Sequence, residues 1–260
     1  QGKYIEDCIK SVLKQNYPNF EHIIIDGGST DETIEVLNKY PHLKWISEPD
    51  EGQSDAVNKG FKMAKGEIIG WLNADDVYIE GCFLKIVEAF RKSNADVVYG
   101  EIIFTDQNLN IIRRKYDHPF DIKILLYVGC FIPSASTFYR RKIIDENNFL
   151  NTKLKTIMDY DYFCKLALKG YNFFYIPEPI AFFRKTGENY GKKYEFLWKK
   201  ETLDIKNKYI NKTKINNKFY NFIIKIFYFI YLFKRIYLKY KIHGIISIIK
   251  SNYRAKDIKI

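Results

Sequence analysis

The first hundred residues alternate between short apolar runs and segments in which apolar positions recur every three or four residues. Buried strands are predicted at four apolar runs, 20–25, 44–47, 67–72 and 97–99. Helical spacing is found at 5–13, 29–40, 53–65 and 81–92. Strands that alternate with helices of this length predict an α/β fold, with a Rossmann-like, mostly parallel sheet and helices on both faces.

The second half has a less regular pattern, and its last third differs in composition. We expect a hairpin over 101–114, a strand at 134–139, a helix at 159–169 and a strand at 171–176. From residue 186 the chain becomes helical in pattern and rich in Lys, Ile, Tyr and Phe. The sequence therefore divides into a body, 1–184, and a helical tail, 185–260.

The net charge of +11 is confined to the tail. Residues 185–260 hold 19 Lys+Arg and 5 Asp+Glu, a net charge of +14, whereas 1–184 hold 23 and 26, a net charge of −3. Nucleic acid is excluded as a partner because the aromatic residues of the tail come in apolar runs and are not interleaved with the basic ones. Four cysteines without a CxxC pair predict reduced thiols, a cytoplasmic location and no zinc site.

The tail suits either of two roles. Its apolar run 222–233 has twelve residues, too few to cross a bilayer. Aromatic side chains beside Lys234, Arg235 and Lys239 are typical of a helix that lies on an anionic membrane surface, here the inner face of the cell membrane. An ordinary amphipathic helix packed on the body has the same pattern, and the sequence leaves both interpretations open.

Acidic loops follow three of the predicted strands, at 26–29, 48–52 and 73–76. The carboxyl ends of strands in such sheets form the usual ligand site, so these loops should converge. Adjacent carboxylates at Asp75 and Asp76 repel each other unless a cation is bound, and oxygen ligands favour Mn²⁺ or Mg²⁺. Helix capping is the alternative role for this pair.

The turn at Asp26, Gly27 and Gly28 offers exposed backbone N–H groups and a carboxylate that can accept from a nucleobase or ribose. A glycine turn followed by a helix cap explains the same residues. The binding interpretation of this turn is favoured because the turn is the first of three acidic loops that each follow a strand.

Five motifs in register resemble the family-two inverting glycosyltransferases, over residues 1–184. They are Ile25-Asp26-Gly27-Gly28-Ser29-Thr30-Asp31, Trp45-Ile46-Ser47-Glu48-Pro49-Asp50, Gly52-Gln53-Ser54-Asp55-Ala56, Asn58-Lys59-Gly60-Phe61 and Gly70-Trp71-Leu72-Asn73-Ala74-Asp75-Asp76. The resemblance implies a GT-A fold, a nucleoside-diphosphate sugar donor, Mn²⁺ or Mg²⁺, and a carboxylate base. The acidic donor site together with the basic tail favours an acceptor that is a glycan or a lipid-linked glycan of surface polysaccharide synthesis.

The same resemblance implies roles for single residues on the donor side. Asp26, Gly27 and Gly28 would hold the nucleoside, and Asp55 would reach the ribose or the sugar. The metal motif matches 73–76, with Asn73 at its first position in place of the usual acid. Asp75 would contact sugar and metal, with Asp76 the stronger metal ligand. Gly27 also departs from the family, which commonly has a second acid there.

Two further assignments lie late in the body. Asp159, in Met158-Asp159-Tyr160-Asp161, matches the catalytic base, although it could also cap the helix that begins there. Arg184 matches a phosphate-binding arginine, and a surface ion pair is the alternative. The histidine that often follows in the family is replaced by Thr186.

The sequence leads to three further expectations. The family begins with a strand and a nucleobase loop, and the run at 1–4 resembles the end of that loop, so the first central strand is expected to be missing. A sugar-phosphate nucleotidyltransferase is the rival enzyme, and it would need a glycine-rich phosphate loop at the first strand. A catalytically impaired adaptor that binds membrane through its tail is the non-enzymatic alternative.

Overall fold

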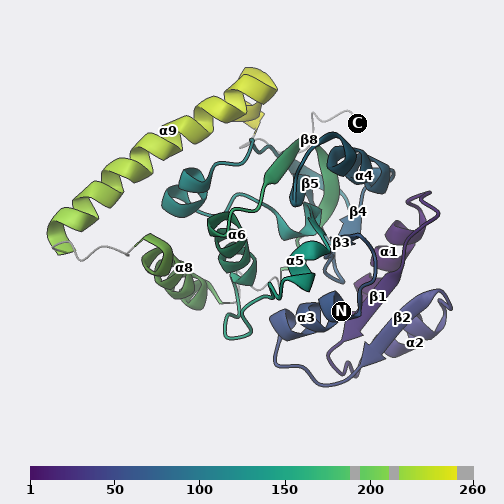
Figure 1. Ribbon diagram of the computed structural model, residues 1–260. Helices are drawn as coiled ribbons and strands as arrows, with labels where there is room; N and C mark the ends of the chain where they lie inside the picture. Colours follow the sequence, from purple (N-terminus) through teal and green to yellow (C-terminus); the bar gives the residue numbers. More distant parts are fainter. Residues whose placement is uncertain (188–193, 211–216, 251–260) are drawn as a thin grey trace.

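A computed structural model describes residues 1–187, 194–210 and 217–250 of the chain. The α/β class is confirmed, and the strands form two sheets (Figure 1). The smaller sheet pairs β1 (His22–Asp26) with β2 (Leu43–Ser47) in parallel. The larger sheet has the order β3-β7-β5-β8-β4, with β6 paired to β5.

The larger sheet is mixed, so the expectation of a mostly parallel sheet is wrong for these strands. Its strands are β3 (Ile68–Gly70), β4 (Val77–Tyr78), β5 (Val97–Thr105), β6 (Ile111–Lys115), β7 (Thr137–Arg140) and β8 (Phe173–Arg184). Only β5 and β8 pair in parallel there. The reason is connectivity: β6 returns directly from β5 as a hairpin, and β4 and β7 lie antiparallel to their partners.

Helices cover both faces of the larger sheet. Along β5, Val97 and Tyr99 face one apolar cluster and Val98 and Ile102 the other, as the alternation of a strand requires. The first cluster contains α3 (Gln53–Met63) and α6 (Met158–Leu168). The second contains α4 (Cys82–Lys92). The sequence-predicted helices and strands of the body are found within a few residues of these bounds, except that β5 continues past 99 to Thr105 and β8 past 176 to Arg184.

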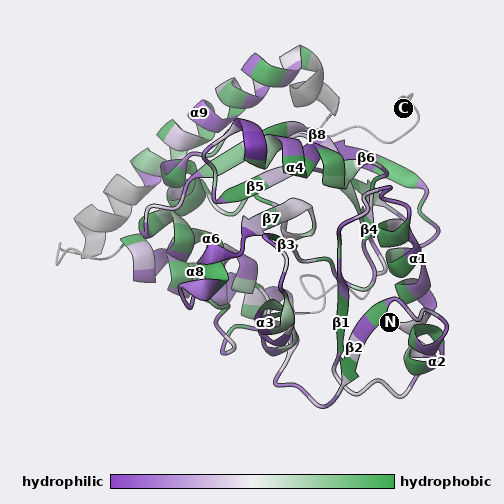
Figure 2. Ribbon diagram, turned by 45° about the vertical axis from the view of Figure 1, so that its right-hand side comes forward, coloured by the Kyte–Doolittle hydropathy of each residue, from purple (hydrophilic) through white to green (hydrophobic). Residues whose placement is uncertain are grey.

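The smaller sheet has its own helices. These are α1 (Gly2–Leu13) and α2 (Thr33–Asn38), which share a third apolar cluster built around Ile9 and Leu37. Figure 2 shows β1 as hydrophobic over most of its length, although its isoleucines are only half-buried. Three short elements lie in the second half of the body: η1 (Ile124–Val128), η2 (Ser134–Ser136) and α5 (Lys142–Asp145).

The tail forms α8 (Glu195–Ile210) and α9 (Asn217–Lys250), with a break in α9 at Gly244, where φ is 67°. One face of α9 packs on the body: Tyr231 stacks on Tyr127, with ring centroids 5.4 Å apart, and Arg235 approaches Asp117. The interpretation of the tail as a packed helix is therefore confirmed for this face. No helix among the described residues has the length and apolar character to span a bilayer.

Candidate active site

Acidic loops from separate elements line one cleft at the carboxyl ends of β1 and β3. Asp26, Gly27, Asn73, Asp75 and Asp159 all border it. The sequence predicted that these loops converge, and the structure brings them together. It adds Asp159 from the amino end of α6, more than eighty residues further along the chain.

The turn after β1 is shaped by its own carboxylate. Oδ2 of Asp26 accepts from the backbone N–H groups of Gly28, at 3.1 Å, and Ser29, at 2.9 Å, and from Oγ of Ser47, at 2.6 Å. Burial opposes ionisation here, but hydrogen bonds from Ser29 and Ser47 outweigh it and lower the pKa of Asp26. A carboxylate held ionised in this way fixes the turn, and φ of 81° at Gly28 fits a residue without Cβ.

Gly27 leaves room for a carboxylate from the next loop. A Cβ at position 27 would overlap Oδ2 of Asp50, so the acid lies where a side chain at 27 would point. Oδ1 of Asp50 accepts from the N–H of Gly52 at 2.7 Å. The space beside Gly27 is thus occupied by the carboxylate of Asp50, to which the sequence analysis gave no role.

Asp55 lies in the first turn of α3 but does not border the cleft. Its Oδ2 is 3.4 Å from Nζ of Lys59, which is also 2.8 Å from a carboxylate oxygen of Glu48. The structure therefore places the predicted donor-binding Asp55 in an ion-pair group beside the cleft.

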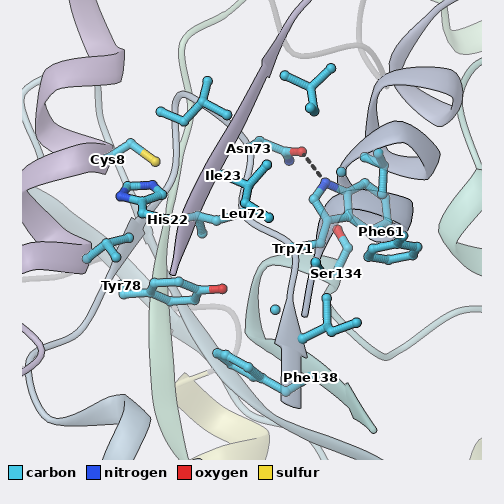
Figure 3. A pocket seen from close by; sticks show the side chains of 18 of the residues that line it. Cys8, His22, Ile23, Phe61, Trp71, Leu72, Asn73, Tyr78, Ser134 and Phe138 are labelled. Atoms are coloured by element: carbon cyan, nitrogen blue, oxygen red, sulfur yellow. Dashed lines mark hydrogen bonds between the residues drawn. The ribbon is translucent and has the colours of Figure 1, made fainter. Parts of the chain in front are cut away.

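Asn73 connects the loop after β3 to its surroundings (Figure 3). Its Oδ1 accepts from Nε2 of Gln53 at 2.7 Å and from Nε1 of Trp71 at 3.1 Å. Its Nδ2 donates to Oδ2 of Asp76 at 3.1 Å. An amide can both accept and donate, whereas an ionised acid at position 73 would only accept and would face Asp76 with like charge. The departure from the family motif thus has a structural reason.

The two adjacent acids differ in position. Asp75 is half-buried on the cleft wall, whereas Asp76 is 1% exposed and lies beneath it. Both oxygens of Asp76 accept hydrogen bonds, from Asn73 and from the backbone N–H of Arg184 at 3.1 Å. Asp75 is therefore the member of the pair that faces the cleft.

Arg184 is buried and joins three separate segments of the chain by hydrogen bonds. It is 2% exposed, and it donates through Nε to the backbone oxygen of Asp75 at 3.0 Å and through a terminal nitrogen to Asp7 at 2.8 Å. The other terminal nitrogen donates to the backbone oxygen of Gln107 at 2.9 Å. The ion pair that the sequence analysis gave as the alternative is present, with Asp7, although the guanidinium itself is buried. Arg184 does not border the cleft, so the structure does not bring it to the expected phosphate position.

The electrostatics of the acidic pair suit a cation. Burial, and then the charge of Asp75, raise the pKa of Asp76 well above its ordinary value, and burial raises that of Asp75. No group of three or more metal-ligating side chains is found in the described part of the chain. The carboxylate of Asp75, which faces the cleft, suits Mg²⁺ or Mn²⁺, because these ions keep coordination positions for water and phosphate oxygens. The residues present therefore fit such an ion.

Asp159 has the properties of a general base. It lies in the first turn of α6, and its Oδ1 accepts from the N–H of Tyr160 at 2.8 Å. Burial raises the pKa of Asp159 to about 6, which is near the working range of a proton acceptor. The neighbouring Asp161 has another task, since it is 3% exposed and binds Lys208 and Tyr209 of α8.

Sequence reasoning also missed Lys115, at the end of β6. Its Nζ donates to Asp117 at 2.6 Å and to the backbone oxygen of Phe131, and its charge acts on Asp159 and favours the ionised form. No local motif marks Lys115, because it reaches the site from a hairpin strand. Gln53 and Trp71 were present in the quoted motifs but had been given no role.

The fold is shared with solved glycosyltransferases. TarS 1–349 of S. aureus, solved in complex with UDP-GlcNAc, superposes with a TM-score of 0.64 at 22% identity, over 86% of this chain and 68% of that one. The mannosyltransferase PcManGT of Pyrobaculum calidifontis, in complex with GDP-Man and Mn²⁺, gives 0.60 at 16% identity, over 84% and 64%. These likenesses show the GT-A fold.

The family model named Glycosyl transferase family 2 matches residues 1–185. The chain belongs to this family. A relative from Mycobacterium bovis, a PGL/p-HBAD biosynthesis glycosyltransferase, is 32% identical over 162 residues, 60% of this chain and 61% of that protein. Chondroitin synthase of Pasteurella multocida is 30% identical over 231 residues, 85% of this chain and 23% of the synthase. The glycosyl transferase family 2 chain thus spans about three fifths of the length of the mycobacterial relative.

Proposed function

We propose that the protein transfers a sugar from a nucleoside-diphosphate sugar to a hydroxyl group of a glycan or lipid-linked glycan, with inversion. The observation that carries this proposal is the pairing, across one cleft, of a carboxylate with a pKa of about 6 and an acidic loop suited to a divalent ion. Membership of the family, and relatives named for chondroitin and for PGL/p-HBAD synthesis, support a glycan or glycolipid acceptor.

Each group would have a defined part in the transfer. The acceptor hydroxyl gives its proton to Asp159 while its oxygen forms a bond to the anomeric carbon of the donor. The bond from that carbon to the diphosphate breaks on the opposite face, which inverts the configuration. Asp75 would hold Mn²⁺ or Mg²⁺, and this ion, when bound, offsets the charge on the departing diphosphate.

Other residues would act by positioning. Asn73 holds Gln53, Trp71 and Asp76 in one hydrogen-bonded group, so the loop that presents Asp75 is pre-organised. Arg184 binds the same loop from below. The turn that Asp26 fixes would lie against the nucleoside, although the N–H groups of Gly28 and Ser29 already donate to Asp26.

The products distinguish this proposal from the nucleotidyltransferase alternative. The protein is incubated with UDP-, GDP- and dTDP-sugars, Mn²⁺ and an acceptor panel, and the released phosphate compound is identified. We expect nucleoside diphosphate, and product in which the anomeric configuration is inverted by NMR. Release of pyrophosphate from a sugar phosphate and a nucleoside triphosphate would support the rival enzyme. Nucleoside diphosphate with retained configuration would disprove the inverting mechanism.

We further propose that α9 attaches the protein to an anionic membrane surface at the cytoplasmic face. Away from the packed face, α9 carries a stripe of exposed apolar side chains that includes Phe229, Phe233 and Tyr237, which are 55%, 69% and 60% exposed. Such a stripe on a helix of net charge +7, with seven Lys+Arg and no Asp or Glu in 217–250, is complementary to anionic headgroups. Deleting α9 would uncover Tyr127 and Asp117, so point variants provide a cleaner test than truncation.

Vesicle flotation measures this attachment. With vesicles of phosphatidylglycerol and phosphatidylcholine, the double variant Phe229→Ser/Phe233→Ser is expected to lose most of its vesicle-bound fraction. Phe196→Ser, at a residue 83% exposed on α8, is the matched control and should float like the parent. Equal flotation of all three proteins would contradict the assignment of α9 as the anchor and leave the adaptor alternative without support.

A further inference from the structure

Helix α8 lies beside α6, the helix whose first turn carries Asp159 (Figure 1 and Figure 2). Two residues of α8 are buried, Glu201 and Ile205. Ile205 belongs to the apolar cluster that also contains Met158 and Tyr160, the chain neighbours of Asp159. Glu201 is an acid, and burying a charged group costs free energy unless its oxygens are hydrogen-bonded. The contacts of Glu201 therefore indicate why an acid lies at this position.

Glu201 holds the backbone immediately before α6. Its Oε1 accepts from the backbone N–H of Lys155, and its Oε2 accepts from the backbone N–H of Thr156, both at 3.0 Å. Oε2 also accepts from Oγ1 of Thr156 at 2.7 Å. Thr156 borders the cleft, three residues before Asp159. Both oxygens of the buried acid are thus used to fix two consecutive residues at the cleft.

A second contact of α8 lies just beyond Asp159. The buried Asp161 accepts through Oδ1 from Nζ of Lys208 at 2.7 Å and from the hydroxyl group of Tyr209 at 2.8 Å. Asp159 therefore lies between two segments, 155–156 and 161, that are both bonded to α8. The hydrogen bond to Asp159 itself comes from the next residue in the chain, so the place of this acid depends on the backbone that carries it.

The loop before α6 also reaches the donor side of the cleft. Nζ of Lys155 donates to the backbone oxygen of Glu51 at 2.6 Å. The loop therefore connects Glu201 to both sides of the cleft, to the base through Thr156 and to the donor side through Lys155. The first route has the stronger contacts, because Thr156 is bound through both its N–H and its hydroxyl group, whereas the side chain of Lys155 is long and exposed.

We infer that Glu201 is a positioning residue for the transfer: it fixes the loop before α6 so that Asp159 is held against the acceptor hydroxyl. This inference rests on the proposed function and deepens it. A base must lie within hydrogen-bond distance of the proton that it removes, and a displacement of about 1 Å can lower the rate about 100-fold. Glu201 acts without touching substrate, and α8 becomes a working part of the catalytic unit.

Glu201→Gln tests the inference on the full chain. Glutamine keeps one acceptor oxygen, but its NH₂ group cannot accept, so at least one donor of the loop loses its partner. We expect hydrogen–deuterium exchange at the amides of 155–161 to become about tenfold faster. We also expect kcat to fall by about tenfold or more with an unchanged KM for the donor, measured well below the unfolding temperature. The matched control is Glu195→Gln, at an exposed acid of the same helix, which should behave as the parent in both measurements.

Thr156 offers a second pair of variants, which decides the matter if Glu201→Gln does not fold. Thr156→Val removes the hydroxyl group that donates to Glu201, and Thr156→Ser keeps it. The fall in kcat should therefore be larger in Thr156→Val than in Thr156→Ser. Equal values of kcat in the two variants would overturn the inference.

Three results with Glu201→Gln would also overturn it. Faster exchange with parental kcat would show that Glu201 supports the fold alone. Unchanged exchange at 155–161 would show that Glu201 does not hold this loop. A raised donor KM with parental kcat would assign the effect to the route through Lys155. If the parent itself releases no nucleoside diphosphate, the proposed function fails, and the exchange measurement alone then decides whether Glu201 holds the start of α6.

Discussion

The loop after β3 and the amino end of α6 both present carboxylates with raised pKa values, but the causes differ. At the loop, burial is the main cause for both acids, and the charge of Asp75 raises the pKa of Asp76 further. At α6, burial alone raises the pKa of Asp159, and no neighbouring acid is among the main causes of that shift. Two adjacent carboxylates can be stabilised by binding a cation between them. A single buried carboxylate is stabilised by binding a proton. This difference supports the proposal that the first region binds a metal ion and that the second accepts a proton.

The largest expected difference within the pair is between Asp75→Asn and Asp76→Asn. Asp75 faces the cleft, so its loss should raise the Mn²⁺ concentration for half-maximal activity by more than about 100-fold. Asp76 lies beneath Asp75 and would not contact the ion directly. Loss of such an outer partner typically lowers metal affinity by about 10–100-fold. Metal titrations of both variants measure this order. Asp145→Asn, at an exposed acid on α5, is the matched control and should behave as the parent.

The reverse order, with Asp76→Asn the more damaging, would show that the buried acid is the direct ligand. Equal metal titration curves for both variants and the control would show that this loop does not bind the metal ion. Either result would break the contrast between the two regions.

The pH dependence of kcat/KM tests the role of Asp159 at the start of α6. With a pKa of about 6, Asp159 is protonated and inactive as a base below that value. We expect kcat/KM at saturating Mn²⁺ to rise about tenfold per pH unit up to about 6 and then to level. A profile that stays flat between pH 4.5 and 7 would mean that no carboxylate of this pKa accepts the proton.

The smallest expected effect is on stability. The folded-state pKa of Asp159 lies above its ordinary value of 3.8, so the folded protein binds this proton more tightly than the unfolded chain. That contribution to stability is present below about pH 4 and is lost as the pH rises through 6. Asp159→Asn should therefore be more stable than the parent at pH 8 by about 1–2 kcal/mol, discounted for partial exposure, or about 2–6 °C in Tm. The difference should vanish at pH 4.

An Asp159→Asn protein that melts with the parent at both pH values would show that burial does not strain this carboxylate. A gain at pH 4 equal to the gain at pH 8 would point to packing instead of charge.

The sequence predicted most of the donor side because its residues lie in short loops directly after strands. Asp26, Asn73 and Asp75 follow apolar runs, and their convergence needs only the rule that parallel strands end at one edge. The role of Arg184 could not be read in this way. Its partners Asp7 and Gln107 are 177 and 77 residues distant, and no local pattern indicates such contacts.

The mixed sheet and the packing of α9 on the body could not be predicted from the sequence, because both depend on contacts between residues that are far apart in the chain. The two-residue strand β4 gives almost no periodic signal, and β5 pairs with β8 across more than seventy residues. In α9, Arg235 approaches Asp117 and His243 lies 2.8 Å from a carboxylate oxygen of Glu101, which is buried. Charges that look like a solvated face in the sequence are thus partly anchors to the body.

The proposed transfer depends most on Asp159, and one paired measurement on Asp159→Asn tests this role. Donor binding is followed by calorimetry with the nucleotide sugar and Mn²⁺, and transfer is followed as nucleoside diphosphate released in the presence of acceptor. We predict unchanged donor affinity with transfer reduced by about 10²–10⁴-fold, the range of a lost general base. Transfer at the parental rate by a variant that still binds donor would contradict the central claim.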